Sequence, residues 1–160
     1  MIHSITNEQE ALLRFKQEIQ ADNCGFMILW ASQEFCCWRG VCCSNRTGHV
    51  IGLYVSGVLN CYRNPGFYHL RGTLSPSPIE LGCLNYLNLS HVGFQGGTPY
   101  PQANLSNLTS LDLSYNYSPF YIDSLGWLSY LTLLKVVSFG LVYLSLTGLD
   151  AIHLQPSFLK

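Results

Sequence analysis

Seven cysteines are the residues of this 160-residue chain with the most evident chemistry, because a reduced cytosolic protein seldom carries so many. Four of them form two vicinal pairs, Cys36 with Cys37 and Cys42 with Cys43. These thiols could bind zinc together with His49, but vicinal pairs do not give the separated Cys-x-x-Cys knuckles that wrap a tetrahedral ion. The preferred interpretation is disulfide formation in an oxidising compartment. Since the number of cysteines is odd, at least one thiol is unpaired or bonded to another chain.

Five Asn-x-Ser/Thr tripeptides lie between residues 45 and 116. One such tripeptide arises readily by chance, but five beside the cysteines support a secreted or luminal surface. The predicted glycosylation sites are Asn45, Asn88, Asn104, Asn107 and Asn116. The first 25 residues, however, contain no basic stretch followed by an unbroken apolar run, so no signal peptide is expected within them.

Catalytic residues are not recognisable in the sequence. The five histidines are dispersed, and the chain contains no Ser elbow, no His-Glu-x-x-His motif and no Gly-rich phosphate loop. Asp112 and Asp123 would form a pair of carboxylates only by accident of folding. We therefore predict no enzymatic activity, no cofactor and no bound metal.

Charge and hydropathy narrow the classes of function further. Eight Lys and Arg against nine Asp and Glu give a formal net charge of −1, and the basic residues are scattered, which argues against nucleic acid as a partner. Charged residues make up 11% of the chain, against about 25% in an ordinary soluble domain. Hydrophobic residues reach 48% and the mean hydropathy is +0.19, so a disordered chain is not expected.

The N-terminal segment predicts an amphipathic helix over Glu8–Gln20, because apolar residues recur at offsets of three and four among charged and polar ones. A capping box beginning at Thr6 or Asn7 is expected to start this helix. Its apolar side chains are Leu12, Phe15 and Ile19. We interpret this stripe as packing surface rather than as a partner-binding face, because short helices seldom stand alone in water.

Leucines recur at a fixed interval in the second half of the chain. The segment LNYLNLS at residues 84–90 is followed by LTSLDLSYN at residues 108–116, and its three framework leucines return 24 residues later. This L-x-x-L-x-L pattern is typical of a leucine-rich repeat, whose unit has about 20–29 residues. Asn116 stands at the repeat's characteristic Asn position, from which the side chain can hydrogen-bond the backbone of the turn below.

Less regular copies flank these two repeats. Residues 50–55 show the same spacing 34 residues before Leu84, so an insertion is expected around residues 60–69. A later copy fits LVYLSLTGL at residues 141–149, and a second segment competes for this role. The competing framework residues are Leu131, Leu134 and Val136. In each repeat a short strand should turn its leucines inward against the next coil. Leu-rich strands of a β-sandwich are disfavoured, because a 24-residue period is too long for hairpins.

In order and spacing, these segments resemble the N-terminal part of plant extracellular leucine-rich-repeat receptors, nearest to the receptor-like proteins. The matching segments are EALLRFK, CCWRGVCCSNRTGHV, LRGTLSPS, LNYLNLS and NLTSLDLSYN. The resemblance implies an α/β leucine-rich-repeat solenoid, with a helical, disulfide-stapled cap over residues 1–49 and imperfect repeats over residues 50–160. It also implies a fragment, because members begin with a signal peptide and continue through many more repeats to one membrane span.

The family's cap has the pattern Cys-Cys-x-Trp-x-Gly-Val-x-Cys, and the resemblance implies a disulfide between Cys37 and Cys43. One residue is missing here between Cys37 and Trp38. The family's remaining cap cysteine corresponds to Ser4, which leaves the first cysteine of the vicinal pair without its implied partner. The pairing stays open for Cys24, Cys36, Cys42, Cys61 and Cys83.

The resemblance implies a non-catalytic recognition module on the extracellular side of the plasma membrane. Such a module binds a protein or peptide ligand and a co-receptor kinase in defence or developmental signalling. Outward residues of the concave strand face would contact the ligand, and tyrosines suit this role because they give large contact area at little entropic cost. These residues are Tyr54, Tyr86, Asn88, His91, Ser110, Asp112 and Tyr115. A glycan on Asn88 would obstruct the same face.

Two alternatives stay open. Residues 125–149 are long enough to span a bilayer, with Lys135 as their only charge, which would make the chain a fragment of an integral membrane protein. A central Lys costs about 2.5–3.5 kcal/mol on insertion, and the polar residues of the segment dilute its hydropathy, so we favour solenoid strands. The chain could also be a non-functional gene fragment.

Overall fold

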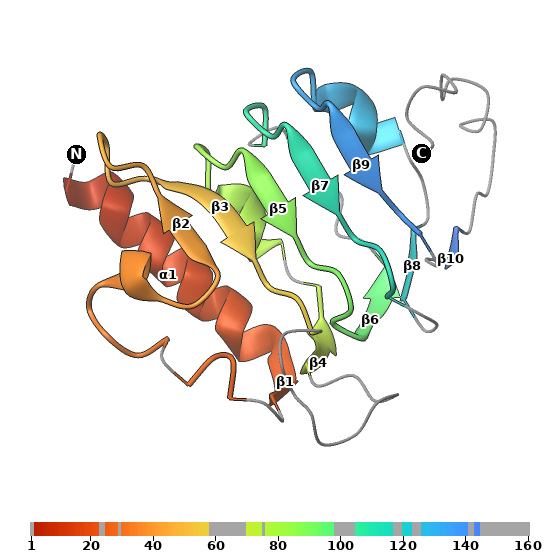
Figure 1. Ribbon diagram of the computed structural model, residues 1–160, viewed down its shortest axis with the longest axis horizontal. Coiled ribbons are helices and arrows are strands. Elements are labelled where there is room, and N and C mark those ends of the chain that lie inside the picture. The colour runs from red at the N-terminus through yellow and green to blue at the C-terminus, as the bar shows by residue number, and fades with distance from the viewer. Residues whose placement is uncertain are drawn as a thin grey trace.

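Each complete coil of the chain contributes one strand to each of two sheets, as the computed structural model shows (Figure 1). The structure describes residues 2–22, 25–28, 30–57, 70–74, 76–97, 105–116, 120–122, 126–140 and 143–144. The first sheet consists, in spatial order, of β2 (Val41–Cys43), β3 (Val50–Tyr54), β5 (Tyr86–Asn88), β7 (Ser110–Asp112) and β9 (Val136–Ser138). The second consists of β1 (Ile19–Asp22), β4 (Leu70–Thr73), β6 (Phe94–Gly97), β8 (Phe120–Ile122) and β10 (Tyr143–Leu144). The strands of the repeats pair in parallel, and only β1 and β2, which belong to the cap, pair antiparallel with their neighbours.

The N-terminal helix α1 spans Ile2–Glu18 and begins six residues before the predicted start. The expected capping box is therefore wrong, because Thr6 and Asn7 lie inside the helix. Residues 2–7 contain neither Gly nor Pro, so no residue there stops the helix from extending towards the N-terminus. The predicted apolar stripe is confirmed at Leu12 and Phe15, which are both buried.

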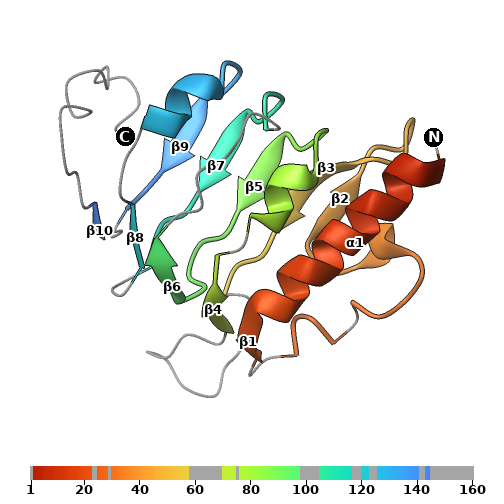
Figure 2. The same cartoon turned by 180° about the vertical axis from the view of Figure 1, so that it is seen from behind.

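The chain passes directly from α1 into β1, so that Ile19 begins a strand rather than ending the helix. Here β1 pairs antiparallel with β4, and Ile19 lies opposite Gly72. A Cβ at Gly72 would lie 2.2 Å from the backbone oxygen of Glu18, so only glycine permits this approach. Figure 2 shows that α1 and the short 3₁₀ helix η2 (Ser77–Glu80) cover one side of the first sheet. The other side of this sheet is not covered by either helix.

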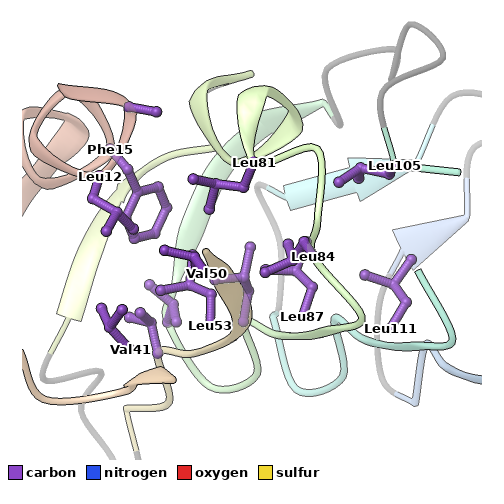
Figure 3. Packing of buried hydrophobic residues seen from close by; sticks show 14 of the residues in the cluster. Leu12, Phe15, Val41, Val50, Leu53, Leu81, Leu84, Leu87, Leu105 and Leu111 are labelled. Atoms are coloured by element: carbon purple, nitrogen blue, oxygen red, sulfur yellow. The ribbon is translucent and has the colours of Figure 1, made fainter. Parts of the chain in front are cut away.

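The framework leucines form one continuous column across the first sheet. Leu53 of β3 pairs with Leu87 of β5, Leu87 with Leu111 of β7, and Leu111 with Val137 of β9. All four side chains are buried. Figure 3 shows Leu53, Leu87 and Leu111 among the leucines of the neighbouring turns. The predicted solenoid, with Leu87 and Leu111 on adjoining parallel strands, is therefore confirmed.

The second sheet was not predicted from the leucine pattern. Its strands have two to four residues and no leucine period of their own. Leu70 of β4 and Phe94 of β6 are nevertheless buried, so these strands close the core on the far side of the coil.

Asn116 has the structural role that the repeat pattern predicts. Its Nδ2 donates to the backbone oxygens of Leu89 at 2.8 Å and Leu113 at 2.9 Å, and its Oδ1 accepts from Val92 N at 3.1 Å. A glycan on Asn116 would be incompatible with this packing, so the glycosylation of Asn116 stays an untested prediction. The side chain is fully buried, and the nitrogen that would carry the glycan is already hydrogen-bonded to two carbonyls.

The last described repeat has a different register from the one predicted. Its framework residues are Leu134, Val137 and Phe139, whereas Val136 is 58% exposed. The three later repeats carry an extra leucine three residues before the strand pattern, at residues 81, 105 and 131. Starting the last pattern at Leu131 therefore shifted its later positions. The segment at residues 141–149 is not a copy of the leucine strand where it is described, because β10 belongs to the second sheet.

The cap disulfide joins Cys36 to Cys43, with a Cα–Cα distance of 5.5 Å, so the implied pairing of Cys37 with Cys43 is wrong. Cys37 is an exposed free thiol at the end of the short helix η1 (Phe35–Cys37). The reason lies in the register of Trp38, which is buried and stacks on Trp30 at 5.3 Å. In the family pattern, the cysteine that forms the disulfide stands two residues before the tryptophan. One residue is missing before Trp38 in this chain, so Cys36 occupies that position instead of Cys37.

The described residues contain no helix that is long and apolar enough to span a membrane. Within residues 126–140 the chain instead forms the 3₁₀ helix η3 (Gly126–Tyr130) and β9. The alternative of a helical span over residues 125–149 is therefore wrong for this part of the segment.

The corrected disulfide gives a direct test. Cys36→Ser should lower the free energy of unfolding by about 2–3 kcal/mol, because it opens a short covalent loop. Cys37→Ser should change it by less than about 0.5 kcal/mol, since that thiol is exposed and unbonded. Urea denaturation of the two variants measures both values. The opposite order of stabilities would support the pairing of Cys37 with Cys43.

Candidate functional site

The free side of the first sheet carries the predicted contact residues. Alternation along each strand turns the leucines inward and their neighbours outward, and the parallel register aligns these outward residues in two rows. We call this surface the strand face; it consists of Gly52, Tyr54, Tyr86, Asn88, Ser110, Asp112, Val136 and Ser138, with His91 and Tyr115 at its edge. Five of the seven predicted residues thus lie on these strands and two, His91 and Tyr115, lie at their edge, whereas ligand contact stays a prediction.

Asn88 and Asp112 are equivalent residues of successive repeats and lie side by side in the register. Asp112 Oδ1 accepts from the backbone N–H of Ser114 at 2.9 Å and from its hydroxyl at 2.6 Å, and Asn88 Oδ1 accepts from Ser90 in the same way. The Asn88 amide donates to Asp112 Oδ2 at 3.4 Å. Much of the hydrogen-bonding capacity of both side chains therefore fixes the turns that follow β5 and β7.

His91 and Tyr115 form a stacked pair at the edge of the strand face. Their ring centroids are 4.2 Å apart with an interplanar angle of 16°. Both residues have positive φ, 57° and 58°, because each follows a strand in the same turn of successive repeats. The backbone of each residue is hydrogen-bonded to the following coil: His91 N donates to Ser114 O, and Tyr115 N donates to Gly140 O. The 24-residue spacing pairs these positions, but it gives no sign of the ring stacking or of the positive φ.

Burial lowers the pKa of His91 below its ordinary value of 6.5, although the carboxylate of Asp112 acts in the opposite direction. The imidazole is therefore neutral near neutral pH, and within the described part of the chain its buried Nδ1 has no hydrogen-bond partner. Burial, Cys42 and Tyr86 all raise the pKa of Tyr54. Both aromatic groups are thus uncharged at neutral pH.

Tyrosines dominate the exposed area of the strand face. Tyr54, Tyr86 and Tyr115 are each between 41% and 45% exposed. The ring of Tyr54 lies over Gly52, where a Cβ would come within 2.7 Å of Cε2. The absence of a side chain at Gly52 therefore makes room for this ring on the sheet.

Sequence reasoning missed three members of the strand face, Gly52 of β3 and two residues of β9. Val136 pairs with Ser110 and adds an apolar side chain to the outward row, and Ser138 pairs with Asp112. The incorrect register of the last repeat hid both residues. The extra leucine that precedes the three later strand patterns, at residues 81, 105 and 131, would have revealed the correct alignment.

The zinc hypothesis based on the vicinal cysteines is not supported by the structure. Cys36 and Cys43 are bonded to each other, so neither can bind a metal as a thiolate. His49 lies instead beside Glu8, with 3.1 Å between His49 Nδ1 and Glu8 Oε1. Cys24 and Cys61 lie outside the described residues.

Comparisons with known proteins agree with this architecture. Residues 5–44 match the family model of the leucine rich repeat N-terminal domain. Receptor-like protein EIX2 of Solanum lycopersicum is 40% identical over 113 residues, which cover 69% of this chain and 11% of that protein. Among solved structures, PEPR1–AtPEP1 is 25% identical with a TM-score of 0.67, and the match covers 86% of this chain and 18% of that one. The ectodomain of the Arabidopsis thaliana receptor kinase GASSHO1/SCHENGEN3 is 27% identical with a TM-score of 0.60, covering 84% and 15%.

The two-sheet coil with its helical cap therefore defines a plant leucine-rich-repeat ectodomain. The chain belongs to the plant leucine-rich-repeat receptor-like proteins and corresponds to their N-terminal cap and first repeats. It spans about a tenth to a sixth of the length of the curated relatives EIX2 and EIX1. The matched region is a non-catalytic ectodomain.

The lowered pKa of His91 predicts a pH-dependent stability. As the pH falls below about 6.5, the unfolded chain takes up the His91 proton before the folded chain does, so the free energy of unfolding should decrease. His91→Gln removes this contribution, and its melting temperature should fall less than that of the wild type between about pH 7 and about pH 5. Thermal melts of both proteins at the two pH values measure the difference. An equal or larger fall in the variant would contradict the lowered pKa.

Proposed function

We propose that the strand face binds an extended segment of a peptide or protein ligand. The observation that carries this proposal is the exposure of tyrosines on a face backed by the leucine column: Tyr54 lies beside Asn88 in one outward row, and Tyr86 lies between Gly52 and Ser110 in the other. A tyrosine gives a large apolar contact and one hydrogen-bonding group while few rotatable bonds are fixed on binding. The strand face therefore offers contact area without the cost of ordering long flexible side chains.

The arrangement of polar groups supports a chain-like ligand. Asn88, Ser110, Asp112 and Ser138 lie in adjacent positions across β5, β7 and β9, between the tyrosines of β3 and β5 and the His91–Tyr115 stack. A ligand running across the strands would meet a polar site at each repeat spacing. Asn88 and Asp112 would then contact it with the hydrogen-bonding capacity that their turns leave unused.

Related ectodomains support the same class of ligand. The ectodomain of GASSHO1/SCHENGEN3 has been crystallised in complex with Casparian strip integrity factor 2. By this likeness, we infer that the present chain acts in defence or developmental signalling on the extracellular side of the plasma membrane and that a co-receptor kinase completes its response. Residues 1–49 would then act as the cap, and residues 50–160 would present the ligand-contacting repeats.

The remaining predicted glycosylation sites differ in exposure and in whether a glycan would cover the strand face. Asn45 lies in an exposed turn between β2 and β3, and Asn107 is exposed as well, although its Nδ2 donates to Gly82 O at 2.9 Å. A glycan on either residue would not replace an outward side chain of the strand face. Asn88 is half-buried and donates to Asp112, so it is a poorer acceptor, and Asn104 lies outside the described residues.

Peptide selection on the immobilised full chain tests the proposal. Peptides selected from a random linear library should bind Tyr86→Ala at least about tenfold more weakly than the wild type, because an exposed aromatic anchor is removed. The matched control is Tyr130→Ala, which removes a 67% exposed tyrosine on η3, outside the strand face, and should leave the affinity unchanged. Selected peptides that depend on Tyr130 and not on Tyr86 would contradict the proposal.

A further inference from the structure

Three donor groups from three separate segments meet where the cap contacts the first complete coil. Glu8 comes from α1, His49 from the residue just before β3, and Cys83 from the turn between η2 and β5. One ligand atom from each residue lies within 4.8 Å of the other two. This cluster lies outside the strand face, and neither the disulfide nor the leucine column involves it.

The carboxylate of Glu8 is held in a fixed position. Its residue is only 4% exposed, and Oε2 accepts from the backbone N–H of Val50 at 3.1 Å. The other oxygen, Oε1, lies 3.1 Å from Nδ1 of His49. The turn that carries His49 is itself fixed, since its backbone oxygen accepts from Ser44 N at 2.9 Å. Two of the three donors are therefore already positioned by the fold.

The spacing of these atoms is close to that of a tetrahedral metal site. Bond lengths of about 2.0–2.1 Å from zinc to nitrogen or oxygen, and about 2.3 Å to sulfur, place neighbouring ligand atoms roughly 3.3–3.6 Å apart. The distance between Glu8 Oε1 and His49 Nδ1 is already of this size. Cys83 needs only a small movement to complete the set, because its ligand atom already lies within 4.8 Å of those of Glu8 and His49.

The chemistry of the donors selects the ion. A carboxylate, an imidazole and a thiolate together suit Zn²⁺, whereas Ca²⁺ and Mg²⁺ prefer oxygen ligands alone. We propose that Glu8, His49 and Cys83 form a zinc-binding site whose fourth position is open to water. On binding, Zn²⁺ replaces the proton of the Cys83 thiol, which passes to solvent, and His49 binds as the neutral imidazole. The carboxylate and the thiolate then balance the charge of the ion.

The site would act as a clamp between the cap and the repeats. Glu8 and His49 are 41 residues apart in sequence, and Cys83 belongs to the next coil, so one ion would tie together three segments that the cap disulfide does not join. Because the ion binds only the folded chain, zinc should also raise the melting temperature.

Protection of thiols from alkylation tests the site within a single molecule. Cys37 and Cys42 are exposed free thiols and serve as internal controls for Cys83. Zn²⁺ added to the full chain with its disulfide intact should slow iodoacetamide labelling of Cys83 at least about tenfold, as read by peptide mass mapping. Labelling of the two control thiols should not change. Equal labelling of Cys83 with and without Zn²⁺ would overturn the proposal.

Variants test the same site by calorimetry and spectroscopy. Cys83→Ser and His49→Gln should each weaken Zn²⁺ binding at least about tenfold, whereas Cys42→Ser and His91→Gln should bind as the wild type does. With Co²⁺ as the probe, the wild type should show a thiolate-to-metal charge-transfer band that Cys83→Ser lacks. A band that persists in Cys83→Ser and disappears in Cys42→Ser would contradict the assignment. Should His49→Gln fail to fold, the labelling of wild-type Cys83 still decides the result.

Discussion

Every part of this fold depends on one constraint: a coil can bury its framework leucines only against the coils on either side of it. A single coil of about 24 residues would leave an apolar edge in water, so its stability comes from stacking rather than from its own contacts. The column from Leu53 through Leu87 and Leu111 to Val137 meets this constraint, because each side chain is buried beside its equivalent on the adjoining strand. At the first coil, α1 and β2 replace the missing neighbour and cover the exposed end of the column.

The same stacking also fixes polar groups on the strand face and beneath it. Asn116 satisfies backbone groups of two coils from within the core, and the side chains of Asn88 and Asp112 fix the turns at the ends of their strands. Backbone groups that would otherwise be buried without partners are thus bonded at each repeat. The outward tyrosines consequently stand on a surface that does not need to reorganise when a partner binds. Rigid presentation of this kind suits a non-catalytic ectodomain.

How far the sequence predicts the structure depends on whether a feature repeats. The leucine period predicted the parallel register of β5 and β7, the inward column and the outward residues, because a regular spacing leaves one way to stack. It could not show that Cys36 pairs with Cys43, since that pairing follows from how Trp38 packs. The second sheet was equally hidden, because its strands carry no leucine period that returns from coil to coil. The cluster at Glu8 joins segments that are distant in sequence, so only the folded chain brings it together.

Hydrogen exchange on a variant of the column tests the central constraint most directly. Leu111→Ala removes a buried side chain of β7 and should lower the free energy of unfolding by about 2–5 kcal/mol. Because the coils stabilise one another, the amides of β5 and β9 should lose protection together with those of β7. Loss of protection confined to β7, with β5 and β9 exchanging as in the wild type, would contradict the account.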